Sequence, residues 1–402
     1  MKILVICQYY SPEPFRLNDI CEELVRLGHE VTVVTGTPNY PEGEIYPGYE
    51  KGARRDETLS GVRVHRCPLI PRKTGSAGRL MNYFSFPVTA KRYVNGKECA
   101  PASGGKFDVV FVNQLSPVMM AEPGLSYGKK HGVPVVLYCL DLWPDSVVAG
   151  GLSRGGLPYR IFSSLSKKIY RRADRILVAN ASFAGSISEN AGVDAAKISY
   201  LPQYAEDVFE YLGPRVPDGT LNLTFAGNVG AAQDVGAVLG AAELTRDAPV
   251  VYHVVGGGTE LDRLKKLASD KGLENVVFHG RRPLSEMPEF YKKSDAMLVT
   301  MKDDPALNMI LPGKVQSYMA AGKPVIGAIN GETARVISQS GCGLVSPAGD
   351  SRALARNVMI FSENIREAAD SMGRAAREYY EKHFDKHIFM KKLTDELEAA
   401  LR

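Results

Sequence analysis

The 402-residue sequence lacks the hallmarks of a secreted, membrane-spanning or nucleic-acid-binding protein. Its six cysteines are scattered, and no pair has metal or redox spacing, so we expect reduced thiols in the cytosol. No apolar run approaches the roughly 20 residues that span a bilayer. Met1-Lys2 leads directly into an expected strand, so no signal peptide is expected. The net charge of +4 is only mildly basic, which disfavours nucleic acid as a partner.

The chain contains enough residues for two ordinary domains. Its apolar fraction of 45% is that of a soluble globular protein, and such a chain can bury two cores. Expected strands and helices alternate in two successive series, which predicts two doubly wound α/β domains. We place the first over residues 1–203 and the second over residues 204–384, since Pro202, Pro214, Pro217 and Gly219 interrupt the periodicity between the two series.

The segment 305–325, PALNMILPGKVQSYMAAGKPV, predicts a turn, a helix and the start of a buried strand. Val315, Tyr318 and Met319 have the spacing of one buried helix face. Lys314 lies in the first turn, where the helix dipole favours an anion over a cation. A phosphate bound at this helix start would explain why a positively charged residue stands there. The alternative is a solvated lysine at the start of a surface helix, and the spacing alone does not decide between them.

Two glycine-rich turns follow expected strands of the second half. They are Gly227-Asn228-Val229-Gly230 and Gly256-Gly257-Gly258. A glycine turn between a strand and a helix lets backbone N–H groups approach a phosphate. Each turn on its own is a weak signal, because simple tight turns also use glycine.

In the first half, an expected strand at 134–140 delivers Asp141-Leu142-Trp143-Pro144-Asp145-Ser146 to the carboxyl edge of a sheet. Ligands of doubly wound sheets bind at this edge. Asp141 is the best candidate in this segment for binding or deprotonating a substrate hydroxyl. The alternative is a structural aspartate that caps the loop.

Pro312-Gly313-Lys314, the run from Tyr318 to Val325, and the Asp141–Ser146 segment resemble family-4 glycosyltransferases of bacterial surface-polysaccharide and O-antigen synthesis. The resemblance implies the GT-B fold, an α/β architecture of two doubly wound Rossmann-like domains facing across a cleft. The C-terminal helix, near 385–402, is then expected to pack back on the first domain. The implied activity is a retaining, hexosyltransferase-type reaction that needs no metal or other cofactor.

The resemblance also implies the substrates and the place of action. The donor would be a UDP-sugar, with an N-acetylated or deoxy sugar, and the acceptor a lipid-linked (polyprenyl diphosphate) saccharide. The enzyme would be cytoplasmic and peripheral on the inner face of the plasma membrane. Two alternatives stay open: a catalytically inactive GT-B partner subunit, and a UDP-N-acetylhexosamine epimerase.

The predicted site residues fall into two groups. Asp141 is the catalytic candidate, and the acceptor candidates are Glu13, Arg16, Asn18, Gln114, Ser116, Trp143 and Asp145. The donor candidates are Gly227, Asn228, Gly230, Gly256, Gly257, Gly258, Arg281, Leu284, Met309, Ile310, Leu311, Pro312, Gly313, Lys314 and Ser317.

The sequence departs from the family pattern at several of these places. Asn228 and Gln233 stand near the positions of a basic pair that holds the diphosphate in many members. Met309 and Ser317 stand where many members carry two glutamates, and neither side chain can replace a carboxylate. Lys314, Arg281 and the helix N-termini would then have to hold the diphosphate.

The segment 71–93 mixes basic residues with an aromatic and apolar patch. Such a composition suits the surface of an anionic bilayer. The alternative is an ordinary amphipathic helix that packs on the sheet. The candidate membrane residues are Arg72, Lys73, Arg79, Leu80, Tyr83 and Phe84.

Overall fold

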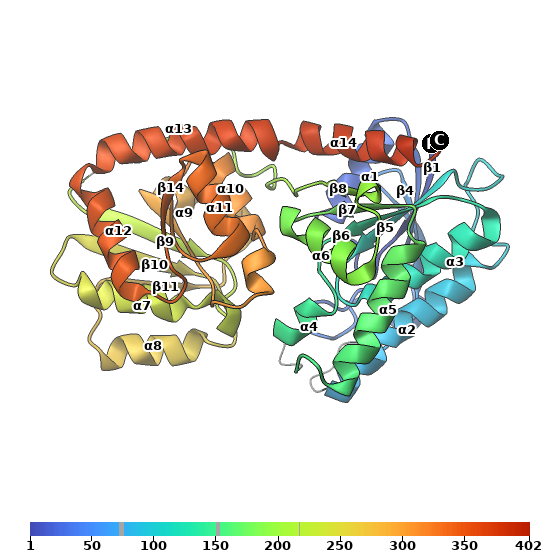
Figure 1. Ribbon diagram of the computed structural model, residues 1–402, viewed down its shortest axis with the longest axis horizontal. Helices are drawn as coiled ribbons and strands as arrows, with labels where there is room; N and C mark the ends of the chain where they lie inside the picture. Colours follow the sequence, from blue (N-terminus) through green and yellow to red (C-terminus); the bar gives the residue numbers. More distant parts are fainter. Residues whose placement is uncertain (72–75, 150–152, 217) are drawn as a thin grey trace. The chain divides into compact units, whose positions relative to one another are not determined.

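The computed structural model describes residues 1–71, 76–149, 153–216 and 218–402 (Figure 1). The chain forms two compact units, Met1–Leu201 together with Met390–Arg402, and Pro202–Phe389. Each unit contains one sheet of mainly parallel strands with helices packed on it. The predicted fold class of two parallel-sheet α/β domains is thus confirmed. Arg72 and Lys73 lie outside the described residues.

The first unit is built on an eight-stranded sheet of order β3-β4-β2-β1-β5-β6-β7-β8. The strands pair in parallel except β3, which is antiparallel to β4. The apolar residues Ile3 to Ile6 of β1 are fully buried. Such a continuous apolar run is expected of a parallel strand that helices cover on both faces. The strands are β1 (Lys2–Ile6), β2 (Glu30–Gly36), β3 (Asp56–Leu59), β4 (Val62–Cys67), β5 (Val109–Gln114), β6 (Val135–Cys139), β7 (Arg175–Val178) and β8 (Ile198–Tyr200).

Helices connect these strands. α1 buries Ile20, Cys21 and Leu24, which share one face of the helix, and α6 ends at Gly192 in the left-handed conformation. The helices are α1 (Leu17–Arg26), α2 (Ser76–Val94), α3 (Glu122–His131), α4 (Asp145–Ala149), α5 (Leu157–Arg172) and α6 (Ala181–Ala191), with single 3₁₀ turns η1 (Glu50–Gly52), η2 (Val118–Ala121) and η3 (Ala195–Lys197). The last turns of α14 (Lys386–Ala399) belong to this unit, where Glu396 pairs with Arg175 at 2.6 Å.

The second unit has a six-stranded parallel sheet of order β11-β10-β9-β12-β13-β14. The strands are β9 (Leu221–Ala226), β10 (Val250–Val255), β11 (Val276–Gly280), β12 (Ala296–Thr300), β13 (Val325–Ala328) and β14 (Gly343–Ser346). The helices are α7 (Val235–Leu244), α8 (Leu261–Asp270), α9 (Met287–Lys292), α10 (Gly313–Ala320), α11 (Gly331–Ser340), α12 (Ser351–Glu363) and α13 (Ile365–His383), with η4 (Ala231–Gln233), η5 (Leu284–Glu286) and η6 (Leu307–Met309). The strand order reverses beside β9, and ligands of such sheets bind at that point, beyond the carboxyl ends of the strands.

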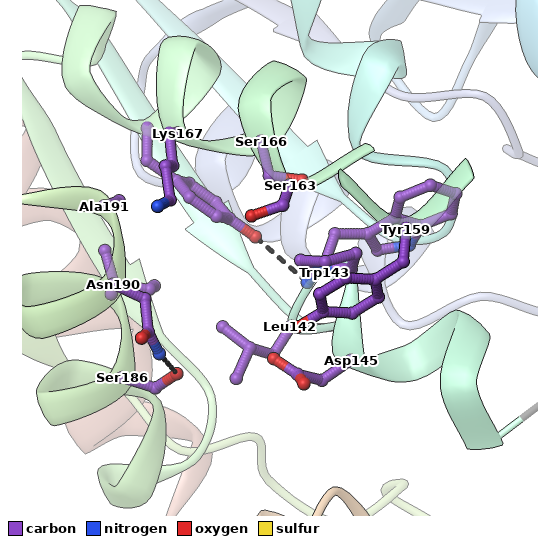
Figure 2. Close-up of a pocket in the computed structure, with 13 residues that line it drawn as sticks. Leu142, Trp143, Asp145, Tyr159, Ser163, Ser166, Lys167, Ser186, Asn190 and Ala191 are labelled. Atoms are coloured by element: carbon purple, nitrogen blue, oxygen red, sulfur yellow. Dashed lines mark hydrogen bonds between the residues drawn. The ribbon is translucent and has the colours of Figure 1, made fainter. Parts of the chain in front are cut away.

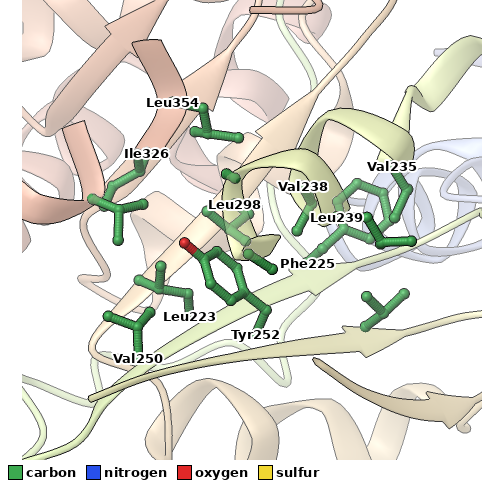
Figure 3. Packing of buried hydrophobic residues seen from close by; sticks show 14 of the residues in the cluster. Leu223, Phe225, Val235, Val238, Leu239, Val250, Tyr252, Leu298, Ile326 and Leu354 are labelled. Atoms are coloured by element: carbon green, nitrogen blue, oxygen red, sulfur yellow. The ribbon is translucent and has the colours of Figure 1, made fainter. Parts of the chain in front are cut away.

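Two apolar layers cover this sheet. Successive residues of β12 contribute to opposite layers, since Leu298 belongs to one cluster and Val299 to the other. Figure 3 shows the first layer, in which the Tyr252 ring lies among the side chains of neighbouring strands and α7. The second layer packs α10 against the sheet through Val315, Tyr318 and Met319, the face that the sequence pattern predicted. This packing fixes where α10 begins, and hence where Lys314 lies.

The turns after β9 and β10 touch through their backbones. The Gly227 amide donates to the Val255 carbonyl at 2.9 Å, and the Val229 amide donates to the Gly257 carbonyl at 2.8 Å. Gly256 has φ +153°, and a Cβ placed on it would lie 1.8 Å from the Gly227 carbonyl oxygen. Glycine is required at this position because another backbone occupies the space of a side chain.

We expect Gly256→Ala to destabilise the second unit by about 3 kcal/mol, because overpacking adds to an unfavourable φ. Calorimetry of the full chain should show one transition lowered by about 6 °C or more. Gly257→Ala is the matched control, since a Cβ there would lie 3.6 Å from Arg281 Cβ, an ordinary contact. Equal melting of both variants would contradict the close-packed arrangement of the turns.

Candidate active site

The first candidate region, in the second unit, centres on the side chain of Lys314. Its Nζ lies 3.8 Å from the centroid of the Phe225 ring, near the end of β9. The same atom would lie 2.8 Å from a Cβ placed on Gly227, so the lysine reaches the glycine turn after β9. The ammonium is buried and has no hydrogen-bond partner among the described residues. The alternative of a solvated surface lysine is therefore excluded.

Burial lowers the pKa of Lys314 to about 7, because the charged form loses its hydration shell. The face of the Phe225 ring attracts a cation but carries no full negative charge. An anion that entered beside the ammonium would favour its charged form and raise this pKa. The first turn of α10 also offers backbone N–H groups and the positive end of the helix dipole. The site thus has the chemistry of a phosphate pocket.

Of the predicted donor glycines, Gly227 lies against the Lys314 side chain, and the others pack around the turn that contains it. Asn228 Nδ2 and the Gly230 amide both donate to Gln233 Oε1, at 3.0 and 3.2 Å, so these polar groups hold the turn together. Gly258, like Gly256, is required by backbone packing, since its Cβ would lie 2.4 Å from the Val229 carbonyl oxygen. Arg281 lies next to Gly257 and is exposed, as is Leu284. Packing accounts for the glycines of the second turn, and their contact with a ligand stays a prediction.

The stretch before α10 is tied to α11. The Ile310 carbonyl accepts from Thr333 Oγ1 at 2.7 Å, and Leu311 is buried. Met309 closes the 3₁₀ turn η6, and Pro312 precedes the first helical residue, Gly313. These contacts fix the entry of the chain into α10.

A carboxylate that the sequence analysis missed lies beside Ser317. Ser317 Oγ donates to Glu206 Oε2 at 3.2 Å and also approaches the Gly313 carbonyl at 3.2 Å. Glu206 stands in the linker, 111 residues before Ser317, and no local pattern connects the two. The fold therefore brings an acid to a place where the resembling family usually has one in the helix itself.

The second candidate region, in the first unit, centres on Asp141. Its Oδ2 accepts from the Ser116 amide at 3.0 Å, and its backbone carbonyl accepts from Gln114 Nε2 at 2.8 Å. Trp143 Nε1 donates to Ser116 Oγ at 2.7 Å. Burial raises the pKa of Asp141 above its usual value, while the hydrogen bonds from Ser116 oppose this shift. The loops after β5 and β6 thus hold a half-buried aspartate whose carboxylate has increased basicity.

The loop after β1 is fixed by Glu13 rather than open. The Glu13 carboxylate is fully buried and accepts the amides of Asn39, Tyr40 and Tyr10 at 2.9, 2.7 and 3.2 Å. Burial raises its pKa to about 7. Asn18 Nδ2 donates to the Glu13 carbonyl at 2.8 Å. These contacts position the loop, and an acceptor contact by Glu13 or Asn18 stays a prediction.

Arg16 and Asp145 occupy different settings. Arg16 is the residue immediately before α1 and is half-buried. Asp145 opens α4 and pairs with Arg154 at 2.9 Å. Together with Trp143 it lines a small cavity of the first unit (Figure 2).

Residues 76–93 of the predicted membrane segment belong to α2. Leu80, Met81, Phe84 and Val88 on it are 46%, 51%, 43% and 67% exposed. Tyr83 is instead half-buried, and its ring packs edge-on against Trp143 at 5.7 Å between centroids. No helix in the described part of the chain has the length and apolarity to cross a membrane.

The comparisons with known proteins agree with these two units. Residues 15–203 match the model of a glycosyl transferase 4-like domain, and residues 214–379 match the model of glycosyl transferases group 1. WcaI of Escherichia coli K12, whose name assigns it to glycosyl transfer in colanic acid biosynthesis, is 26% identical over 80% of this chain and 82% of its own. WbjE of Pseudomonas aeruginosa, named as a glycosyltransferase, is 26% identical over 68% of this chain and 70% of its own.

Among solved structures, Anabaena HepE in complex with UDP and glucose superposes with a TM-score of 0.70. The two chains are 16% identical, and the match covers 99% of each. At this level of identity the likeness concerns the fold, which is that of the GT-B glycosyltransferases. The family and fold that the sequence resemblance implied are therefore confirmed.

The pKa of Lys314 predicts a pH-dependent stability. The folded chain releases this proton near pH 7 and the unfolded chain near 10.5, so the unfolded state binds more protons between these values. The contribution of Lys314 to the free energy of unfolding therefore rises with pH across this window.

We expect the stability of wild type relative to Lys314→Met to increase by about 1 kcal/mol or more from pH 7 to pH 9. Urea unfolding followed by circular dichroism measures this difference. Lys265→Met on α8, an exposed lysine, is the control, and its difference from wild type should not change with pH. A constant difference for Lys314→Met would show that the ammonium is solvated.

Proposed function

The chain belongs to the glycosyltransferases that join a glycosyl transferase 4-like domain to a group 1 domain, and we propose that its donor is a UDP-sugar. The proposed reaction transfers the sugar, with retention and without a metal, to a lipid-linked saccharide in surface-polysaccharide synthesis. The colanic acid assignment of WcaI and the UDP bound to HepE support the pathway and the donor.

The observation that carries the proposal is the buried ammonium of Lys314, which has no hydrogen-bond partner among the residues that the structure describes. In the proposed reaction the bond between the sugar anomeric carbon and the β-phosphate oxygen breaks, and charge develops on the departing UDP. A cation already in place stabilises that charge without reorganisation during the reaction. Phe225 and the turn at Gly227 hold Lys314 where the turn and the helix N-terminus can also donate to the diphosphate.

Glu206 supports the nucleoside part of the proposal. Its carboxylate lies 3.2 Å from Ser317, one turn after Lys314 on the same helix. A carboxylate accepts hydrogen bonds from vicinal hydroxyls, so Glu206 suits the ribose diol or the hydroxyls of the donor sugar. Glu206 would thereby supply the acid that α10 lacks at Ser317.

Asp141 is the proposed acceptor base. The acceptor hydroxyl forms the new bond to the anomeric carbon on the face from which UDP departs, which retains the configuration, and its proton passes to the Asp141 carboxylate. A raised pKa makes this carboxylate a stronger proton acceptor than an ordinary aspartate. Ser116 holds it in place through its amide and, with Trp143, fixes the loop around it.

We further propose that α2 and α5 dock the enzyme on an anionic membrane. Neither helix contains an aspartate or glutamate. α2 exposes Phe84 and Val88, and α5 exposes Leu157 and Ile161, at 71% and 57%. Basic side chains near exposed apolar ones suit a surface of acidic lipids.

We expect Lys314→Ala to weaken UDP binding at least tenfold, or about 1.4 kcal/mol, because a charge-assisted contact with the diphosphate is lost. Isothermal titration calorimetry measures the dissociation constant at pH 6.5, because this pH lies below the pKa of Lys314 and keeps the lysine charged. Lys265→Ala removes an equal charge from the surface of α8 and should bind as wild type. Unchanged binding by Lys314→Ala would reject the phosphate role, and no UDP binding by wild type would favour an inactive partner subunit.

We expect the wild-type chain to float with vesicles rich in phosphatidylglycerol at low salt and to dissociate as salt is raised. Phe84→Asp combined with Val88→Asp should reduce the bound fraction about fivefold or more, since exposed apolar contacts become charged. Ile360→Asp is the matched control, because this residue is 55% exposed on α12 of the second unit. Absence of the wild-type chain from the floating fraction at low salt would reject membrane docking.

A further inference from the structure

A cavity of about 70 Å³ lies in the first unit between the loop after β6, α5 and α6. Leu142, Trp143 and Asp145 line it from the loop, and the helices contribute chiefly polar residues (Figure 2). These polar residues are Tyr159, Ser163, Ser166, Lys167 and Tyr170 of α5, and Ser186 and Asn190 of α6. None of the helical residues was predicted from the sequence to bind anything.

The charges of this cavity are not balanced. Asp145 is neutralised by Arg154, with 2.9 Å between Oδ1 and the guanidinium. Lys167 has no carboxylate partner within the described part of the chain, and its amino group points from α5 into the space bounded by Asn190 and Leu142 (Figure 2). The cavity therefore presents one uncompensated cation.

Hydrogen-bond donors accompany that cation. Asn190 Nδ2 donates to Ser186 Oγ at 3.0 Å, so the Ser186 hydroxyl proton is directed to another acceptor. The Ser163 hydroxyl faces the same cavity from α5. An ammonium with nearby hydroxyls recognises a compact anion with several acceptor oxygens.

The size of the cavity limits its occupant. A buried water needs about 10–15 Å³ of such space, so this cavity has room for about five waters. That is enough for one phosphoryl group and too little for a sugar ring or a base. The occupant is therefore a free phosphate-sized anion or one such group of a larger molecule.

The outer face of α5 indicates which larger molecule carries it. Leu157, Ile161 and Lys168 are exposed on this face, and α5 belongs to the proposed membrane-docking surface. Lys167 of the cavity directly precedes Lys168 and lies about 100° around the helix from it, so a molecule with an apolar chain along this face can place its headgroup beside Lys167. We propose that the cavity binds a phosphoryl group of a prenyl diphosphate, the lipid carrier of the acceptor. This inference rests on the proposed function and assigns a subsite to its acceptor.

The chain provides its own reporter for the test. Trp143 is the only tryptophan and lines the cavity, so its fluorescence responds to an occupant. The full-length protein is titrated with farnesyl diphosphate, inorganic pyrophosphate or glucuronate, with UDP present in excess to fill the site at Lys314. We expect a saturable change with farnesyl diphosphate, weakened about tenfold or more by Lys167→Met and about threefold or less by Lys167→Arg.

Lys168→Met is the matched control, since Lys168 is the next residue and is exposed outside the cavity. It should bind as wild type. Unchanged binding by Lys167→Met, or an equal loss in Lys168→Met, would overturn the proposal. Circular dichroism melting of each variant excludes a loss caused by unfolding.

Comparing the three titrated ligands distinguishes a lipid-borne phosphoryl group from a free phosphate and from a carboxylate. Tighter binding of farnesyl diphosphate than of pyrophosphate supports the lipid-borne source, and equal binding overturns it. Glucuronate binding with the same dependence on Lys167 overturns the phosphoryl assignment. UDP binding is measured separately by calorimetry. Its absence, with Lys167-dependent binding of farnesyl diphosphate retained, would reject the proposed donor and leave the cavity assignment standing.

Discussion

The proposed donor site depends on a cation that the second unit buries, with no anion beside it in the described part of the chain. Lys314 lies against the Phe225 ring and reaches the turn at Gly227, and its charged form is destabilised there. A fold optimised for stability alone would not keep an unpaired ammonium in this place, because burial of a charge is costly. The arrangement is accounted for if an anion completes it, and the other proposed contacts of the donor follow from that anion. Its position depends on α10, which the apolar layer over β12 and β13 holds in register.

The same principle, a polar group held at the carboxyl edge of a parallel sheet, recurs in the first unit. Asp141 follows the end of β6. It is fixed by Gln114, the last residue of β5, and by Ser116, which follows that strand. Trp143 then connects this loop to α2 through Tyr83 and to α5 through Phe162, at 5.7 and 5.3 Å between ring centroids. One loop thus joins the candidate base, the cavity and the two helices of the proposed membrane surface.

The departures from the family pattern have different structural outcomes. Gln233 and Asn228, which lack charge, bind each other and shape the turn after β9, so the cation at this place comes from Lys314 instead. At Ser317, which lacks a carboxylate, the linker residue Glu206 supplies one. The first replacement, by Lys314, was expected from the sequence. The second is invisible to a comparison of aligned motifs, because Glu206 and Ser317 lie 111 residues apart and only the fold brings them together.

The sequence by itself determined the two α/β units, the strands that end at the candidate sites and the family. These features follow from local apolar periodicity, from glycine and proline positions, and from short motifs such as Pro312-Gly313-Lys314. The tertiary structure alone decided that the Lys314 ammonium is buried, that Glu13 is engaged with backbone amides, and that Glu206 lies beside Ser317. It also formed the cavity at Lys167 from segments that no pattern connects. The physical reason is that periodicity reports which face of an element is buried, whereas burial, pairing and pKa depend on what the other elements place against that face.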